Sequence, residues 1–232
     1  MTLDMELESV LRAPALEMAE YPAKVITLAN SKKMVVRQAK RTEVPILLDA
    51  VRPTMKIERD FYDIVGARLY AELLGWYRYR VRNEYCLVGQ IDGYVVGIVN
   101  GRMVDEDIGI SYHTIAIDRG LKVGAHLFAA KMEHHIEYLG QDEVWITAES
   151  PIGFRRWMIE YNLIKQTGVQ HELGGATSYK LTRQLYFNSK SRLVAGERPV
   201  PEILLNFAHE NLLVADEETI QEKICGTIGG QR

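Results

Sequence analysis

The sequence predicts an α/β fold built around one main domain, and three observations carry that prediction. Two apolar runs at 84–91 and 94–104 flank Asp92-Gly93, a pair that supplies the positive φ angles of a tight hairpin turn. An alternating run at 109–117 enters a helical pattern through a glycine-containing loop, which predicts a strand followed by a helix. The chain has 232 residues, of which 47% are hydrophobic and 25% charged, as is ordinary for a globular protein with a substantial core.

The other elements follow from periodicity and from residues that start or stop helices. Pro45 lies in the first turn of one predicted helix and Pro53 ends it. In chain order the patterns predict a helix at 3–18, a strand at 34–39, helices at 42–53 and 60–79, strands at 84–91, 94–104 and 109–117, a helix reaching about 139, a strand at 143–149, a helix at 152–162, strands at 164–173 and 177–187, and a helix at 202–214. We therefore divide the chain into an N-terminal extension at 1–33, a domain at 34–188 and a C-terminal arm at 189–232.

Composition excludes several classes of function. The formal net charge of −3 and the pI near 6.1 provide no overall cationic field, so we expect no nucleic-acid partner. No apolar run approaches the roughly 20 residues that span a bilayer, and the acidic N-terminal segment lacks the basic start of a signal peptide. The two cysteines, Cys86 and Cys225, offer neither a disulfide framework nor a zinc site. We therefore expect a cytoplasmic protein with no membrane partner.

The loop between the strand at 109–117 and the following helix has the chemistry of a phosphate site. From Ile115 to Lys131 it reads IAIDRGLKVGAHLFAAK, with two glycines and two basic residues near the start of the helix. A strand that enters a helix through small residues leaves several backbone N–H groups pointing at one spot, and the helix N-terminus adds a partial positive charge. The loop therefore predicts a bound phosphate group. The alternative is that Gly120 and Gly124 only permit a tight turn and close helix packing.

This loop and the order of the elements around it resemble the GNAT superfamily of acyl-CoA-dependent N-acyltransferases. The family signature, Gln/Arg-x-x-Gly-x-Gly/Ala, opens a helix after a strand; here Arg119 and Gly124 match it, and Lys122 stands where the first glycine is expected. The hairpin LVGQIDGYVVG is similar to the antiparallel centre of the family, and the resemblance covers 34–187. It implies a GNAT-like central mixed, mostly antiparallel sheet flanked by helices, to which this chain adds N-terminal and C-terminal helical extensions.

The resemblance also implies a binding site for coenzyme A. In that family the loop and the first helical turn cradle the pyrophosphate, and the preceding strand pairs its exposed backbone with the pantetheine arm. Carried onto this chain, the cofactor-binding residues are Ile115, Ala116, Ile117, Arg119, Gly120, Leu121, Lys122, Val123, Gly124, Ala125 and His126. Acetyl-CoA or another acyl-CoA is then the co-substrate, and a primary amine is the acceptor.

The resemblance further implies a base that deprotonates the acceptor amine and an acid that protonates the leaving thiolate. Family members often supply the acid from a tyrosine in the pattern Asn-x-x-Ala-x-x-x-Tyr, and here Trp157 stands at that position. Tyr161, one helical turn later, is the candidate acid, or else a packing aromatic. The candidate bases are Glu149, which could instead cap the next helix, and His113, which could be an ordinary histidine of the sheet.

Two adjacent histidines, His134 and His135, raise the question of a metal site on the long predicted helix. Adjacent side chains leave a helix in different directions, and no second pair of ligands stands at helical spacing. We therefore expect no metal ion and place both histidines on a solvated face.

Together these interpretations predict an N-acyltransferase, most simply an N-acetyltransferase, in which the amine of a small molecule or protein attacks the acyl-CoA directly. Two alternatives stay open. One is a module without turnover that binds acyl-CoA or a protein, and the other is an acyltransferase that takes a longer acyl chain from a carrier protein. Because amphipathic extensions of this kind are more often dimer contacts or covers of the chain's own core than new binding sites, we expect a homodimer.

Overall fold

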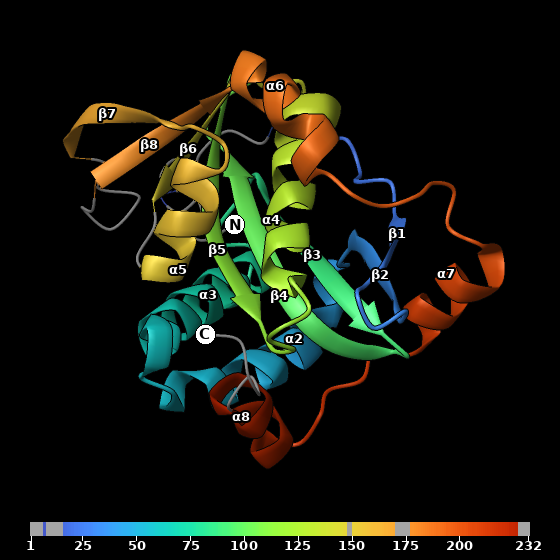
Figure 1. Cartoon of the computed structure of the whole chain (residues 1–232). Helices are drawn as coiled ribbons and strands as arrows, with labels where there is room; N and C mark the ends of the chain where they lie inside the picture. The colour runs from blue at the N-terminus through green and yellow to red at the C-terminus, as the bar shows by residue number, and fades with distance from the viewer. Residues whose placement is uncertain (1–6, 8–15, 148–149, 170–176, 227–232) are drawn as a thin grey trace.

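A computed structural model describes residue 7 and residues 16–147, 150–169 and 177–226, and its centre is one eight-stranded sheet (Figure 1). The strands are β1 (Lys24–Thr27), β2 (Lys33–Gln38), β3 (Glu84–Ile91), β4 (Tyr94–Met103), β5 (Ile108–Ala116), β6 (Glu143–Thr147), β7 (Ile164–Val169) and β8 (Thr177–Thr182). In space they follow the order β1-β2-β3-β4-β5-β6-β8-β7. Every neighbouring pair is antiparallel except β5 and β6, which run parallel.

Helices flank this sheet, so the predicted fold class, a mixed and mostly antiparallel sheet between helices, is confirmed. The α-helices are α2 (Val44–Val51), α3 (Tyr62–Tyr77), α4 (Val123–Glu133), α5 (Pro151–Gly153), α6 (Arg183–Leu193), α7 (Glu202–Glu210) and α8 (Glu217–Cys225). Two of them continue as π-helical turns, α4 into 134–138 and α5 into 154–159. Within the described ranges, no helix has the length and apolar character needed to cross a membrane.

The hairpin at the centre of the sheet forms as predicted. Asp92 and Gly93 both have positive φ angles, 52° and 83°, and they turn the chain between β3 and β4. Alternation along β3 then sends Cys86 toward α2 and α3, whereas Tyr85 points to the opposite face of the sheet. Both faces of this hairpin are therefore buried.

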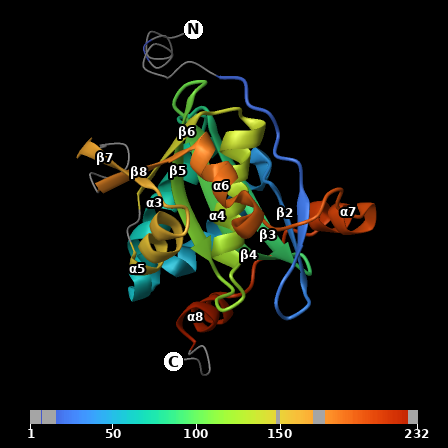
Figure 2. The same ribbon diagram turned by 45° about the horizontal axis from the view of Figure 1, so that its top comes forward.

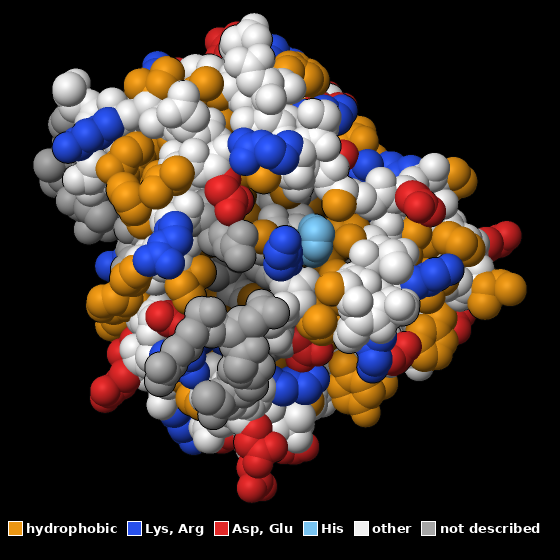
Figure 3. Space-filling model, in the orientation of Figure 1, with side chains coloured by type: hydrophobic (Ala, Val, Ile, Leu, Met, Phe, Trp, Pro, Cys, Tyr) orange, Lys and Arg blue, Asp and Glu red, His pale blue; other side chains and the backbone are white. Residues whose placement is uncertain are grey.

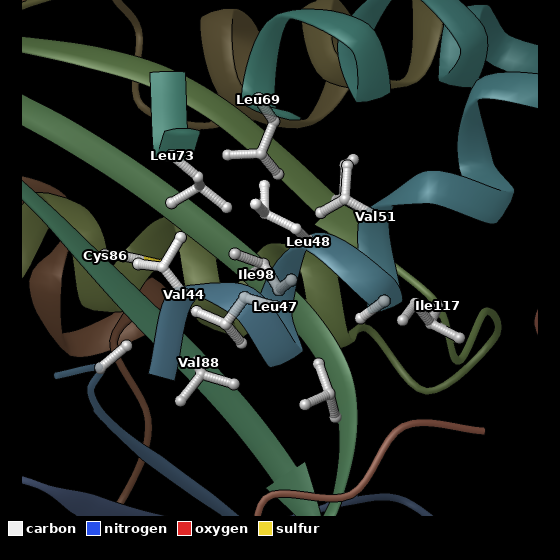
Figure 4. Packing of buried hydrophobic residues seen from close by; sticks show 14 of the residues in the cluster. Val44, Leu47, Leu48, Val51, Leu69, Leu73, Cys86, Val88, Ile98 and Ile117 are labelled. Atoms are coloured by element: carbon white, nitrogen blue, oxygen red, sulfur yellow. The ribbon is translucent and has the colours of Figure 1, made fainter. Parts of the chain in front are cut away.

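The sheet separates two apolar layers. On one face α2 and α3 pack against β3 and β4, and the labelled side chains of Figure 4 belong to this cluster. On the other face α4 crosses β3, β4 and β5, where Leu127 is fully buried (Figures 1 and 2). A third cluster joins α4 to β6, β8 and α6 through residues such as Phe128 and Tyr186. Helix α4 is thus covered on both sides.

This double cover explains why the expected solvated face for His134 and His135 is wrong. Both side chains are fully buried: His134 packs edge-on against Tyr85 with 4.4 Å between ring centroids, and His135 Nδ1 lies 2.5 Å from Gln141 Oε1. Burial lowers the pKa of each imidazole to about 3, so both rings are neutral at pH 7.

Three other elements differ from the predictions. Strand β1 is not predicted, although it pairs with β2 and forms an edge of the sheet. The pattern predicts a strand over 177–187, but β8 ends at Thr182, whose hydroxyl accepts a hydrogen bond from the N–H of Leu185 and caps α6. Helix α8 is also not predicted. Most of the predicted helix at 3–18 lies outside the described residues.

The C-terminal segment lies along the rest of its own chain. Glu197 forms an antiparallel bridge with Val25 of β1, and α7 packs along β2. Helix α8 then inserts Ile220 and Ile224 into the cluster of α2 and α3, at the lower edge of Figure 1. The division of the chain into an extension, a domain and an arm stays a prediction.

Candidate active site

Strands β5 and β6 separate part-way along their length, which opens a gap in the sheet. Their pairing ends at Ser111↔Ile146, whereas β5 stays paired with β4 as far as Ala116↔Gly97. In the described part of the chain, residues 112–116 therefore have no strand partner on the β6 side.

The backbone of this stretch directs polar groups into the gap. Ile117 N–H donates to Val96 O on β4 at 2.8 Å, so strand alternation turns the N–H and C=O groups of Ala116 and Thr114 away from β4. The Ala116 carbonyl accepts a hydrogen bond from Tyr62 Oη at 2.7 Å. The gap thus presents an open strand edge that an extended polar chain could join.

The loop after β5 brings the N-terminus of α4 to the end of this gap. Gly120 and Lys122 both adopt the left-handed conformation, with φ angles of 90° and 59°, and Lys122 is the N-cap. Among the described residues no side-chain cap of α4 is formed by Lys122, and the first N–H groups of any helix have no intrahelical partner, so these groups are available to a ligand. Gly124 allows the helix to approach β5 closely, because a Cβ at this position would lie 3.3 Å from the Cβ of Ala116.

A pocket of about 460 Å³ joins the gap to the start of α4. Figure 3 shows that the surface is hollowed near the centre of the view and that Lys and Arg side chains lie around the hollow. Of the residues predicted to bind coenzyme A, those that line the pocket are Ile115, Ala116, Arg119, Gly120, Lys122, Val123, Gly124 and Ala125. Ile117, Leu121 and His126 are not among the described residues that line it.

Ion pairs set the charge at the mouth of the pocket. Arg119 Nη1 lies 2.7 Å from Asp60 Oδ2, and Lys223 Nζ of α8 lies 2.7 Å from Asp118 Oδ1. Each pair neutralises a carboxylate that would repel a phosphate, and Lys122 adds an exposed positive charge. The cations named here outnumber the carboxylates, so the mouth suits an anion.

His113 lies at the wall of the pocket, in a β-bulge whose backbone is held by side chains. The register between β4 and β5 shifts between Val99 and Gly101, which gives β5 one extra residue. The N–H of His113 donates to Asn100 Oδ1 at 3.0 Å, and its carbonyl accepts from Lys131 Nζ at 3.0 Å. Because both backbone groups are satisfied, the position of His113 is fixed.

The His113 ring belongs to a polar cluster between α3 and the sheet. Its Nε2 lies 3.0 Å from Glu72 Oε1, and Asn100 Nδ2 donates to Glu72 Oε2 at 2.6 Å and to Glu84 Oε1 at 3.0 Å. Burial raises the pKa of Glu84 to about 8, so this carboxyl is mostly protonated at pH 7. Burial also lowers the pKa of Lys131, beneath the bulge, to about 7. Glu72 is the carboxylate in contact with the imidazole.

The other catalytic candidates are placed differently. Tyr161 is buried against Phe128, its hydroxyl has no partner among the described residues, and it is not among those that line the pocket. Trp157 does line the pocket and stacks on Phe128 at 4.5 Å between ring centroids. Glu149 lies outside the described residues. Tyr112, which the pattern does not single out, lines the pocket, and burial raises its pKa to about 12.

The sequence carries a weak signal for the residues around His113. Asn100 interrupts the apolar run of β4, and Glu72 lies at helical spacing beside Leu69 and Leu73 on the buried face of α3. A polar side chain on an apolar face needs a hydrogen-bond partner. The pattern does not reveal which partner, because the residues that meet here are far apart in the chain.

Comparison with known proteins places this arrangement in a structural class. No family model and no curated protein matches the sequence. The structure is similar to that of an uncharacterized protein from Bacillus halodurans, with a TM-score of 0.53 and 12% identity, covering 74% of this chain and 96% of that one. It is also similar to the GNAT domain of S. lividans PAT, with a TM-score of 0.50 and 11% identity, covering 72% of this chain and 99% of that one. The protein therefore has the GNAT fold.

Proposed function

We propose that the protein is an acyl-CoA-dependent N-acyltransferase, most simply an N-acetyltransferase, that acts on a primary amine of a small molecule or protein. The observation that carries the proposal is the gap between β5 and β6, which opens onto the uncapped N-terminus of α4. Coenzyme A has an amide-containing arm followed by a pyrophosphate. A strand edge suits the arm and a helix N-terminus suits the pyrophosphate, in that order along the pocket.

In this proposal different residues of the pocket bind different parts of coenzyme A. The backbone of 114–116 pairs with the pantetheine arm, and the first N–H groups of α4 bind the pyrophosphate. Arg119 contributes a forked hydrogen-bond donor and Lys122 a point charge. Ile117, Leu121 and His126 belong to the predicted set, but they are not among the described residues that line the pocket, and we assign them no contact.

The chemical step forms one C–N bond, breaks one C–S bond and moves one proton. The amine nitrogen attacks the thioester carbonyl, the thiolate leaves, and the proton passes from nitrogen to sulfur. We assign His113 as the general base, because its ring lies at the pocket wall; it takes the proton, and the imidazolium then returns it to the thiolate. We assign Tyr161 no role in the proposed reaction, because it is buried in the cluster around Phe128. Glu149 stays a prediction.

Isothermal titration with acetyl-CoA and with free coenzyme A, at low and moderate salt, tests the binding step. We expect micromolar affinity that weakens as salt screens the phosphate contacts. Arg119→Met should weaken binding about tenfold, since a charge-assisted hydrogen bond contributes roughly 1.5–3 kcal/mol. Arg52→Met is the matched control, because Arg52 also pairs with an aspartate, Asp49, but does not line the pocket. Equal affinities in Arg119→Met and wild type would contradict the role of the loop.

Thiol release from acetyl-CoA in the presence of primary amines tests turnover. Release that depends on the amine supports the enzyme. Binding without release, across small amines and lysine peptides, favours a module without turnover. Turnover only with an acyl chain on a carrier protein favours the second alternative. The cytoplasmic location and the homodimer stay predictions. Light scattering in solution measures the molar mass and so tests the homodimer.

A further inference from the structure

We propose that Glu72 and Asn100 are positioning residues that hold His113 in the one tautomer able to act as a base. This inference rests on the proposed function for its catalytic meaning, because it concerns the proton that leaves the acceptor amine. Neither residue is among the described residues that line the pocket, so neither is argued to touch a substrate. Both act through the imidazole.

The orientation of the Asn100 amide follows from a donor that cannot be reversed. The backbone N–H of His113 can only donate, so the Asn100 atom 3.0 Å away is the oxygen Oδ1. The Asn100 NH₂ group must then be the one that faces Glu72 Oε2, at 2.6 Å. Since an NH₂ group only donates, Oε2 of Glu72 must accept.

The tautomer of His113 follows from the second oxygen of Glu72. As a carboxylate, Glu72 only accepts hydrogen bonds, so the His113 Nε2 at 3.0 Å from Oε1 must carry the hydrogen. The lone pair of the neutral ring then lies on Nδ1. Because Nε2 is engaged by Glu72 and His113 lines the pocket, Nδ1 is the ring nitrogen left to take a proton from an acceptor amine.

The same contacts place a negative charge beside the imidazolium that forms when His113 acts as a base. When His113 takes a proton, its imidazolium keeps the hydrogen bond to Glu72, whose side chain is 23% exposed and lies beside it. The second carboxyl in the cluster, Glu84, is fully buried and accepts from the same Asn100 amide. Asn100 therefore separates two carboxyl groups and leaves Glu72 as the counter-charge of the ring.

Glu72→Gln is the sharp test, because the cluster dictates how the new amide must sit. Asn100 still donates at the position of Oε2, so the glutamine must place its oxygen there and turn its NH₂ group toward His113. Nε2 would then accept, and the hydrogen would move to Nδ1. Nitrogen-15 NMR of the histidine rings reads the tautomer directly, and His113→Gln assigns the signal by its loss.

We expect the Nε2–H tautomer in wild type, the Nδ1–H tautomer in Glu72→Gln, and no change in Glu210→Gln, which alters an exposed glutamate at the end of α7. An unchanged tautomer in Glu72→Gln would overturn the proposal. This NMR measurement needs no acceptor amine, so it tests the positioning role of Glu72 independently of turnover. If no amine is acylated, that result counts against the proposed function and not against the positioning role.

A double-mutant cycle gives the catalytic readout. Glu72→Gln and His113→Gln should each lower kcat about 100-fold, with the acetyl-CoA KM changed less than about twofold. The double variant should be no slower than His113→Gln, because Glu72 acts only through the ring. A further loss of kcat in the double variant, or an effect confined to KM, would show that Glu72 has a structural or binding role instead.

Discussion

Lys122 stands where the GNAT signature has a glycine, and its backbone takes the left-handed conformation that glycine adopts most easily. For other residues this conformation costs roughly 1–2 kcal/mol. The Lys122 side chain is exposed at the mouth of the pocket, where it adds positive charge. A lysine is therefore tolerated at this position at a small conformational cost.

Another residue, Glu84, should make stability depend on pH. Burial raises its pKa from 4.5 to about 8 in the folded protein. The stability that depends on the protonated carboxyl is therefore complete below about pH 4.5 and is lost as the pH rises through 8. Glu84→Gln keeps the shape of the side chain without an ionisable group.

Thermal unfolding between about pH 5 and pH 9 measures this effect. We expect the melting temperature of wild type to fall relative to that of Glu84→Gln as the pH rises. Lys131, whose lowered pKa acts in the opposite direction, is common to both proteins and cancels in the comparison. Parallel curves for the two proteins would show that Glu84 does not titrate in this range.

Among the elements, β5 has to do two things that conflict. It pairs with β4 on both sides of the bulge at His113, and it leaves its other edge open beyond Ser111. An open edge inside a sheet leaves backbone groups without partners, which is costly unless other groups satisfy them. Tyr62 does this for the Ala116 carbonyl, and Lys131 satisfies the carbonyl of His113 in the adjoining bulge. Side chains from α3 and α4 therefore stabilise the gap.

The approach of α4 to β5 should limit the size of the side chain at position 124. A Cβ there already lies 3.3 Å from Ala116 and 3.8 Å from Thr114, so the γ-methyl groups of Gly124→Val have to push the helix away from the strand. We expect the affinity of Gly124→Val for acetyl-CoA to be more than tenfold lower than that of wild type. The affinity of Gly124→Ala should lie between the two. Titration calorimetry measures the affinity and thermal unfolding checks that each variant folds. Unchanged affinity in Gly124→Val would show that the loop does not bind coenzyme A.

At the scale of the whole molecule, Glu133 at the end of α4 connects segments from both ends of the chain. It accepts hydrogen bonds from Tyr21 Oη at 2.7 Å, from Lys24 Nζ of β1 at 2.8 Å, and from both terminal nitrogens of Arg198 at 2.9 and 3.0 Å. Burial alone would raise the pKa of Glu133, but the hydrogen bonds of Arg198 and the charge of Lys24 outweigh it and lower the pKa to about 2. The cluster ties the edge strand and the C-terminal segment to the central helix.

Glu133→Gln should lower the free energy of unfolding by about 3–5 kcal/mol, because it leaves the buried Lys24 and the partly buried Arg198 without their charge partner. Glu217→Gln is the matched control: it also breaks a glutamate–lysine pair, with Lys56 at 2.7 Å, but that pair is exposed and should contribute less than about 1 kcal/mol. Chemical denaturation measures both. Equal effects of the two variants would refute the role of burial.

The lowered pKa of Glu133 also predicts an acid limit to stability. Its contribution is complete above about pH 4.5, the ordinary value, and is lost as the pH falls toward 2. Wild type should therefore approach the stability of Glu133→Gln as the pH falls through this range, which unfolding curves at several pH values can follow. A constant difference between the two proteins would contradict the assignment.

By itself, the sequence determined the centre of the sheet and the loop that leads into α4. Strands β3, β4 and β5 lie within one residue of their predicted bounds, because period-2 alternation and the Asp92-Gly93 turn are local signals that tertiary contacts do not override. The geometry of the loop, which we propose binds an anion, is local in the same way, since it needs only a strand, two left-handed residues and a helix start.

Only the tertiary structure decided which side chains meet in the site and which lie buried. His113, Glu72 and Asn100 come from β5, α3 and β4, and their contact depends on the bulge and on the packing of α3 against the sheet. The burial of His134 and His135 likewise depends on tertiary packing, since both rings lie against Tyr85 of β3 and His134 also lies against Tyr21. Such contacts join residues far apart in the chain, and no local pattern encodes the partner of a polar side chain.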